Sequence, residues 1–424
     1  MQQQRENLSL HKLGVVCGLV AGCWLGAAEA PTKLVTTGLS PFAISLCMVA
    51  GVFVARWTFP TLLKGTAYIF RDLRSRRHLI VWALLAGGLW AVANTLTVIA
   101  IRDVGLAVAF PLWNANTLVG LIWGRVFFGE LKGAERRTKA RVASGVIAIV
   151  ASAALLGFSS THQTGVTITH ASRGVAAALG ACVLWGTMYI PYRKAYLSGM
   201  NPLSFVTAFT VGELLTVGSV AVVLGGGVRV LSSELFHAQH VLFWLFLGGF
   251  VWVVGDLFQH YAAKYLGIGR GIPLSSTNQL WGLAWAGFVF GELRHTATVQ
   301  QWLIVGGSLG MILGAFLLSS AVASGNENAS RDEVVLRECT RYRLNYAETM
   351  RAIAGHVTDG DAGRQRWWDV LIILGALSLF VWFAHTAKIP PLPIDYRWCL
   401  VLSAILLITL AFGVLRLWRD TDFN

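Results

Sequence analysis

The chain has 424 residues, of which 55% are hydrophobic and only 13% are charged, and its formal net charge is +13 at pH 7. So few charged residues exclude an ordinary soluble domain, and the apolar runs reach the roughly 20 residues that span a bilayer core. In a soluble protein the positive charge would suggest nucleic acid. Here it lies in loops between apolar segments, so we expect membrane lipid as a partner and no nucleic acid.

Twelve apolar segments are long enough to cross a membrane, and they predict an all-α membrane protein. The first ten lie near residues 13–30, 41–60, 79–101, 105–128, 142–158, 174–190, 203–225, 241–263, 267–290 and 302–320. Two more follow near residues 369–386 and 397–417.

The first segment resembles a signal peptide, since Arg5 and Lys12 precede an apolar run that ends in Ala28-Glu29-Ala30. Its pattern returns in the middle of the chain, where Trp185 matches Trp24. A cleaved targeting segment has no reason to be duplicated there, so we expect a retained first helix.

Lysine and arginine alternate between the loops. The second and fourth loops and residues 331–366 are rich in them, whereas the odd-numbered loops between carry about one each. This positive-inside pattern predicts an integral protein of the cytoplasmic membrane with both termini in the cytoplasm.

Two stretches of the chain are versions of one segment. Gly87–Leu131 and Gly249–Leu293 align without gaps, and 16 of 45 columns are identical. The shared columns include Pro111 with Pro273, and both copies end in Phe-Gly-Glu-Leu. Hydrophobicity alone cannot place prolines and glutamates in register, so this is a true internal repeat, as is common in secondary transporters.

The repeat extends to about residues 13–158 and 174–320, with five spans in each half. Because five is odd, the second half should enter the membrane from the opposite side, which predicts a ten-helix inverted-repeat (5+5) bundle. We therefore expect one repeat in residues 1–160 and an inverted one in 161–320. Alternating access around a central site follows from that symmetry.

The remaining chain has no counterpart in the repeats. Residues 321–368 form a polar connector in which apolar residues recur at helical spacing from Val335 and Cys339 to Val357. The predicted amphipathic helix could lie on anionic lipid or dock on the cytoplasmic face of the protein. Residues 369–424 hold the two additional transmembrane helices.

Several motifs carry a resemblance to a known family. They are Gly87-Gly88-Leu89-Trp90, the stretch from Gly105 to Pro111, Leu118 to Gly124 followed by Phe128-Gly129-Glu130, the counterparts in the second half, and Pro191-Tyr192-Arg193-Lys194. Over about residues 13–320 the chain resembles the drug/metabolite transporter superfamily and, within it, the glucose/ribose porter family. That family includes bacterial glucose-uptake and rhamnose–proton symport proteins. The resemblance implies two inverted five-helix halves and a sugar or related small polar solute as substrate. The chain departs from the family in its connector, its last two spans and the Asn94/Asp256 pair.

Ionisable residues inside spans cost roughly 2.5–3.5 kcal/mol each at mid-bilayer, so each needs a reason. Arg56, Arg125 and Arg270 fall near predicted cytoplasmic span ends, and we expect them to reach the headgroups. Carboxylates removed from water hold protons more readily, and an Asp/His pair four residues apart could relay one. The candidate proton-coupling residues are Glu29, Glu213, Asp256 and His260. The alternative is that Asp256 and His260 simply bond each other and a facing helix.

Prolines in equivalent spans free backbone carbonyls, which a bilayer tolerates where the backbone lines a wet cavity. Amides, hydroxyls and tryptophans follow these helix-kink positions, Pro111 and Pro273, and suit a neutral polyol. Ordinary interhelical packing is the alternative. The predicted substrate-binding residues are Trp90, Asn94, Trp113, Asn114, Asn116, Trp252, Ser276, Asn278, Gln279 and Trp281.

The sequence has no GxxxxGK[ST] loop, metal-ligand cluster or nucleophile motif, so we expect no enzyme, no cofactor and no metal. The leading interpretation is a secondary transporter of a small polar solute, with H⁺ as the coupling ion. Two alternatives stay open: an exporter of amphipathic metabolites or amino acids, and a non-transporting membrane scaffold or sensor. The Gly/Ala-rich fifth and tenth spans could supply a homodimer interface.

Overall fold

A computed structural model describes residues 2–32, 34–35, 38–104, 109, 112–159, 171–291, 298–356, 365–389 and 394–423. Within these residues the regular structure is entirely helical, and ten helices are long and apolar enough to cross a membrane. They are α1 (Gln2–Ala27), α3 (Pro41–Lys64), α5 (His78–Val104), α8 (Arg136–Ser159), α9 (Ala171–Leu197), α10 (Pro202–Leu224), α12 (Gln239–Leu266), α15 (Thr298–Ser319), α18 (Trp367–Thr386) and α19 (Tyr396–Thr421).

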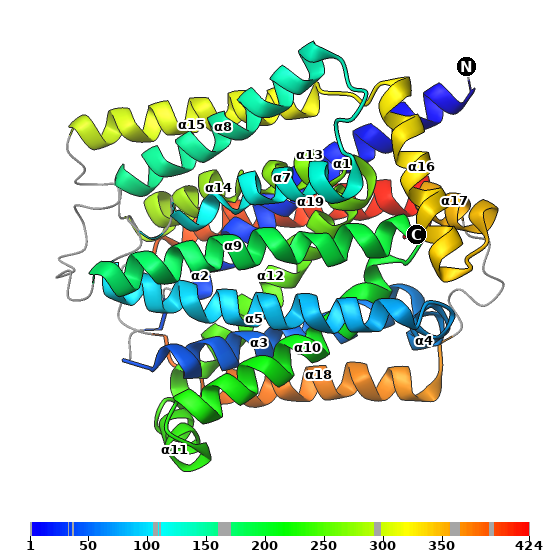
Figure 1. Cartoon of the computed structure of the whole chain (residues 1–424). Coiled ribbons are helices and arrows are strands. Elements are labelled where there is room, and N and C mark those ends of the chain that lie inside the picture. The colour runs from blue at the N-terminus through cyan, green and yellow to red at the C-terminus, as the bar shows by residue number, and fades with distance from the viewer. Residues whose placement is uncertain are drawn as a thin grey trace.

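Shorter helices complete the described fold. They are α2 (Glu29–Thr32), α4 (Thr66–Ser75), α7 (Asn116–Phe128), α11 (Val228–His237), α13 (Ile268–Ser275), α14 (Asn278–Ala284), η2 (Trp285–Val289), α16 (Gly325–Tyr342) and α17 (Tyr346–Ala354). The long helices lie side by side, and both chain termini are at one end with α4, α16 and α17 (Figure 1). We call this the terminal end; the end with α2 and α11 is the far end.

The two predicted spans that contain the shared prolines are not single helices. The chain from 267 to 290 divides into α13, α14 and the π-helical η2, and α7 begins only at Asn116. Pro273 lies near the end of α13, whereas Pro111 lies outside the described residues. Spans were predicted at 105–128 and 267–290 with helix kinks at Pro111 and Pro273. In the second span the helix is interrupted after Pro273, because proline and the polar run after it break the backbone ladder.

The first helix runs across this break. A Cβ atom on Gly22 would come 2.1 Å from the Thr277 hydroxyl, and one on Gly26 would come 2.4 Å from the carbonyl oxygen of Asn278. These two glycines thus allow the backbone of α1 to pack directly on the junction between α13 and α14.

Helices of the two sequence halves exchange partners. α1 packs on α12 as α5 packs on α9, and α12 packs on α3 as α5 packs on α10. In the same manner α7 contacts α9, while α13 and α14 contact α1. Each half therefore supplies one side of all of these contacts.

Equivalent helices begin in the same way at opposite ends of the bundle. Ser40 caps α3 by accepting a hydrogen bond from the N–H of Ala43, and Asn201 caps α10 through the N–H of Leu203. A proline follows each cap at the first helical position, where no N–H is needed. α3 starts at the far end and α10 at the terminal end (Figure 1).

The small residues of α8 and α15 face each other within the chain. A Cβ atom on Gly145, Gly307 or Gly314 would come within 2.9 Å of an atom of the other helix. The glycines that suggested a homodimer interface are thus directed at an intramolecular contact.

The connector forms two helices docked on the terminal end of the bundle. Val334, Val335 and Cys339 of α16 are buried, and Lys194 of α9 lies 2.8 Å from Glu338. The chain turns at Arg343, which adopts left-handed backbone angles, so the predicted single helix is divided into α16 and α17. The apolar face of α16 contacts protein, which corresponds to the docked alternative.

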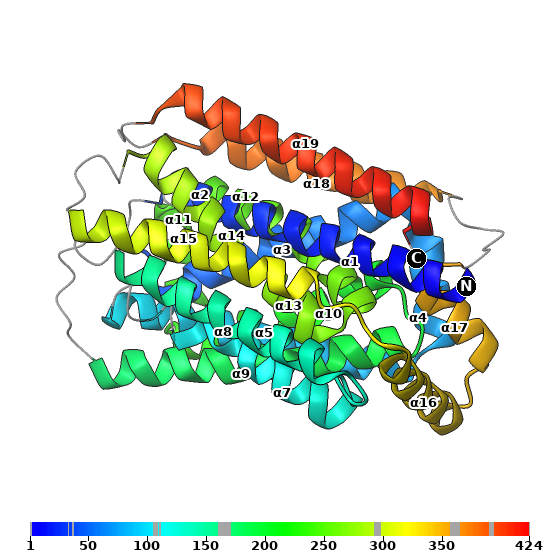
Figure 2. The ribbon, with the colours of Figure 1, turned by 90° about the horizontal axis from the view of Figure 1, so that it is seen from above.

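The last two long helices lie on the same side of the bundle (Figure 2) but apart from each other, with the other long helices between their levels (Figure 1). α18 packs on α3 and α12, and α19 packs on α1 and η2. Their outward surfaces are apolar and exposed, as expected of a lipid-facing layer.

Candidate functional site

A cavity of about 590 Å³ lies in the centre of the bundle and is lined by both sequence halves. Its wall includes Leu39, Pro41 and Arg102 toward the far end and reaches Trp252 and Ser275 deeper inside. Because Leu39 and Pro41 lie at the start of α3, which is at the far end (Figure 1), the cavity extends toward that end.

Nine of the ten predicted substrate-binding residues line this cavity. They are Trp90, Asn94, Trp113, Asn114, Asn116, Trp252, Ser276, Asn278 and Gln279. The tenth, Trp281, is outside the lining and packs with its Cβ atom against Gly26 of α1. Trp281 lies on α14, which begins after the interruption that follows α13. The direction in which its side chain points is therefore set by where α14 begins, and it points toward α1.

Indole rings form much of the wall. Trp90 and Trp252 come from equivalent positions of the repeat, and their ring centroids are 5.1 Å apart. Trp113 meets Trp185 edge to face at 6.3 Å. Flat apolar faces of this kind suit a ligand with C–H faces.

Hydrogen-bonding groups are placed between the rings. Asn94 donates to the Ser45 hydroxyl at 2.9 Å, and Gln259 donates to the Ser275 hydroxyl at 2.5 Å. Gln279 donates to the side-chain oxygen of Asn278 at 2.9 Å. These amides and hydroxyls are uncharged, so the site matches a neutral, hydroxyl-rich ligand.

Sequence reasoning missed Gln259, Tyr189 and Ser45. Gln259 is one turn from Asp256 and two turns from Trp252, so its helix face could have indicated it. Tyr189 also lines the cavity, and its hydroxyl is 3.5 Å from the side-chain oxygen of Asn116. Ser45 accepts a hydrogen bond from Asn94, which lines the cavity. No pattern in the sequence indicates that these two positions are paired.

Beneath the cavity lies a buried charge network. Arg56 of α3 is 0% exposed; its Nη1 lies 2.8 Å from Glu213 of α10 and its Nη2 lies 2.6 Å from Asp256 of α12. His260 Nε2 lies 3.3 Å from the same Asp256 oxygen, and its Nδ1 meets the hydroxyl of Tyr196. The prediction that Arg56 reaches the headgroups was therefore wrong, because two carboxylates from other helices hold it inside.

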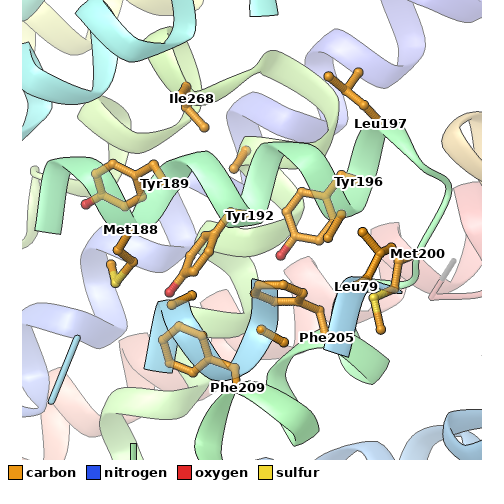
Figure 3. Packing of buried hydrophobic residues seen from close by; sticks show 14 of the residues in the cluster. Leu79, Met188, Tyr189, Tyr192, Tyr196, Leu197, Met200, Phe205, Phe209 and Ile268 are labelled. Atoms are coloured by element: carbon orange, nitrogen blue, oxygen red, sulfur yellow. The ribbon is translucent and has the colours of Figure 1, made fainter. Parts of the chain in front are cut away.

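The network separates the cavity from the terminal end. The Arg56 guanidinium lies 5.5 Å from the ring of Trp252, a cavity residue, and 4.2 Å from that of Phe209. Tyr192 stacks on His260 with centroids 4.1 Å apart. Tyr192, Tyr196, Phe205 and Phe209 gather between α9 and α10 (Figure 3), so aromatic packing closes this side.

The four predicted proton-coupling residues divide into two groups. Glu213, Asp256 and His260 come together around Arg56, from α10 and α12. The side chain of Glu29 lies outside the described residues. Among the described residues, no group of three or more His, Cys, Asp or Glu side chains could hold a metal ion.

The glutamate of the first Phe-Gly-Glu-Leu motif joins the two halves at the terminal end. Glu130 accepts hydrogen bonds from the N–H groups of Ile268 (3.0 Å) and Gly269 (2.9 Å) at the start of α13. The same carboxylate lies 3.0 Å from Nε of Arg193. A carboxylate at a helix N-terminus satisfies free donors and favours the helix dipole, which explains its position. Its counterpart Glu292 lies outside the described residues.

The other two arginines that were predicted near span ends, Arg270 and Arg125, differ in how far they are exposed. Arg270 of α13 is buried and makes a two-pronged ion pair with Glu327 of α16, at 2.7 and 2.9 Å. The prediction of a headgroup contact was wrong for this residue, because the connector supplies a carboxylate. Arg125, near the end of α7, is exposed.

A family model and several known proteins are similar to this chain. The family described as sugar transport protein matches residues 14–159 and 176–346, which together exceed half of the chain. The glucose uptake protein GlcU of Staphylococcus xylosus is 23% identical over 239 residues, covering 55% of this chain and 74% of that protein.

Two further relatives match shorter regions. A putative sugar uptake protein of Streptococcus pyogenes serotype M1 is 31% identical over 146 residues, which are 33% of this chain and 43% of that protein. Transmembrane protein 144 homolog B of Dictyostelium discoideum is 24% identical over 125 residues, 28% of this chain and 34% of that protein.

Proposed function

The chain belongs to the sugar transport protein family, and we propose on that basis that it carries a neutral sugar through the central cavity by alternating access. It is an integral membrane protein with ten candidate membrane helices, and its family indicates a transporter and not an enzyme. The observation that carries the proposal is the cavity itself: 590 Å³, two tryptophan pairs and uncharged amides from both halves.

Alternating access needs two arrangements of similar energy, which an inverted repeat can supply. The exchange of helix partners supports such a two-fold relation, as do the opposite starting ends of α3 and α10. In this proposal the structure is open at the far end. The opposite state forms when the aromatic cluster and the Glu130 contact separate at the terminal end.

The charge count beneath the cavity supports our proposal that transport is coupled to H⁺. Arg56 contributes one positive charge, whereas Glu213 and Asp256 contribute two negative charges when both are ionised. A net charge of −1 buried in a bilayer is costly, so one further cation is required. A proton shared among Glu213, Asp256 and His260 restores neutrality without a metal site.

The link between proton and sugar runs through Trp252. This ring lines the cavity on one side and lies over Arg56 on the other. A sugar that moves the Trp90–Trp252 pair would therefore shift the guanidinium between its two carboxylates. The carboxylate that the guanidinium leaves would then hold the proton, and the carboxylate that it approaches would stay ionised.

The arginine-rich α4 lies at the terminal end with both chain termini (Figure 1), so we assign that end to the cytoplasm of the cytoplasmic membrane. The far-end opening then faces outward. Relatives named for sugar uptake favour import. We also propose that the chain is one of the glucose/ribose porters of the drug/metabolite transporter superfamily, which its motifs resemble.

Counterflow tests this function directly. Purified protein is reconstituted into phosphatidylcholine liposomes, and the liposomes are preloaded with one unlabelled neutral sugar at a time. Entry of the same sugar in labelled form is then measured. We expect a transient excess of label inside for at least one hexose or pentose. Counterflow with amphipathic amines or amino acids alone would favour an exporter, and none with any solute would favour a scaffold.

A further inference from the structure

Two amide side chains in the wall of the central cavity are held by serine hydroxyls from neighbouring helices. Gln259 of α12 donates from its side-chain nitrogen to the hydroxyl of Ser275, at the end of α13, over 2.5 Å. Asn94 of α5 donates in the same way to Ser45 of α3 over 2.9 Å. Both amides line the cavity and are buried. Because an amide carries N–H groups on one side and an oxygen on the other, the atom that meets the serine decides what a ligand meets.

The interruption after Pro273 fixes the direction of the Gln259 hydrogen bond. In a continuing helix the carbonyl of Ile272 would accept from the N–H of Ser276, but that N–H donates to the carbonyl of Pro273 at 3.1 Å. The Ser275 hydroxyl donates to the Ile272 carbonyl at 2.7 Å and so satisfies an acceptor at the helix end. Since a hydroxyl has one proton, Ser275 accepts from Gln259, and the amide nitrogen points at the serine.

A chain of hydroxyls holds the Asn94 amide in the same sense. Thr95 donates to the carbonyl of Ala91 at 2.9 Å. Its oxygen then accepts from the hydroxyl of Ser45, 3.3 Å away, and Ser45 accepts from the nitrogen of Asn94. Within the part of the chain that the structure describes, no protein group donates to the side-chain oxygen of Asn94 or of Gln259. A bound solute is therefore the donor that these two oxygens would meet.

From these contacts we infer that Asn94 and Gln259 determine specificity: each accepts a hydrogen bond from a hydroxyl group of the sugar, so the cavity selects solutes with two such donors and rejects ethers and fluorides of the same shape. The inference rests on the proposed transport of a neutral sugar and names the groups that recognise it. A buried acceptor left without a donor lowers affinity, which is how a polar site rejects an analogue that lacks one hydroxyl.

The two oxygens are placed beside the tryptophan pair. Asn94 is one helical turn from Trp90, and Gln259 is two turns from Trp252, so each amide shares a helix face with one ring. An indole that packs on the C–H face of a sugar would thus hold the hydroxyls at the edge of the same ring within reach of an acceptor.

Deoxy and deoxyfluoro derivatives measure the direction of each hydrogen bond. A fluorine substituent accepts weakly and cannot donate, whereas a deoxy position does neither. Binding of D-glucose, D-galactose and D-xylose, and of each monodeoxy and monodeoxyfluoro derivative, is measured by the change in tryptophan fluorescence of the full-length protein in detergent. For a sugar that binds, we expect two positions at which the deoxyfluoro derivative binds at least about fivefold more weakly than the parent, and no better than the deoxy derivative. Deoxyfluoro derivatives that bind as well as the parent at every position would overturn the inference.

Variants assign the fluorine penalty to its residue. Gln259→Leu should lower affinity for the parent sugar about fivefold and abolish the penalty at one of the two positions while keeping the other. Ser275→Ala leaves Gln259 in place but frees its amide to turn, so the penalty at that position should fall below about twofold, which keeps the test valid should Gln259→Leu not fold. Ser219→Ala is the matched control, because this serine donates to the carbonyl of Leu215 at 2.8 Å but is exposed on α10. Unchanged penalties in both cavity variants, or the same change in the control, would contradict recognition by Gln259.

Transport and recognition are separable in these measurements. Binding with two fluorine penalties but no counterflow would remove transport and leave the recognition by Asn94 and Gln259. Counterflow without a fluorine penalty would leave transport and remove that recognition. No binding of any of the three sugars would remove both.

Discussion

The guanidinium of Arg56 lies 2.6 Å from Oδ2 of Asp256, although 200 positions separate the two residues in the chain. Both side chains are shielded from solvent, and they come from two different helices, α3 and α12. Breaking one partner of such a buried pair leaves an uncompensated charge, at a cost of about 3–5 kcal/mol.

Arg56→Gln should therefore lower the unfolding temperature markedly and abolish transport. Arg125→Gln is the matched control, because its side chain is exposed near the end of α7 and the change should cost no more than about 0.5 kcal/mol. Thermal unfolding in detergent and counterflow in liposomes measure the two effects. Equal stability of both variants would refute a structural role for the network.

Glu213→Gln and Asp256→Asn should uncouple the transporter. Each replaces a carboxylate beside Arg56 with a neutral isostere, so the network no longer needs an additional proton. We expect sugar counterflow to persist while accumulation driven by an imposed pH gradient falls at least tenfold. Glu333→Gln, at an exposed position of α16, serves as the control. Proton coupling by these groups would be abandoned if both variants still concentrated sugar.

Trp90→Leu should weaken sugar binding without unfolding the protein. The ring faces Trp252 in the cavity, and loss of an aromatic contact of about 0.5–1.5 kcal/mol raises the half-saturating sugar concentration about 2- to 13-fold. Trp302→Leu removes an indole that is 72% exposed on α15 and should leave transport unchanged. A similar loss in both variants would point to a general effect of removing tryptophan.

Glu327→Gln should loosen the connector at the terminal end. The change removes one charge from a buried pair with Arg270, and hydrogen bonds to charged groups contribute about 1.5–3 kcal/mol. Cys339, buried on the same helix, should then react with a water-soluble maleimide at least fivefold faster, as read by mass spectrometry. Glu333→Gln on α16 is again the control; no change at Cys339 would show that this ion pair does not hold α16 in place.

Much of the architecture could be predicted from the chain alone, because apolar length and repeated prolines are local signals. Ten of the twelve predicted spans correspond to long helices, and the cavity residues followed from polar positions beside tryptophans. The two remaining spans were predicted with kinks at Pro111 and Pro273, but the length of the interruption was not, because proline marks a break and not its extent. A hydropathy pattern does not distinguish α13, α14 and η2, so the three helices are predicted as one segment.

The charge network shows what sequence reasoning could not supply. Glu213 has no nearby cation in its own helix, and Arg56 resembles a headgroup anchor when judged by position. Only packing of α3 between α10 and α12 brings the two together. The buried ion pair of Arg270 could not be predicted for the same reason, because its partner Glu327 comes from the connector.

Access to the cavity from each side of the membrane tests the central claim most directly. Ser276→Cys, in a protein whose six native cysteines are replaced by alanine, places one thiol in the cavity wall. We expect membrane-impermeant thiol reagents to modify it from either face of a vesicle, with a transported sugar slowing both reactions. Modification confined to one face, whatever the sugar or pH gradient, would contradict a cavity that serves both sides in turn.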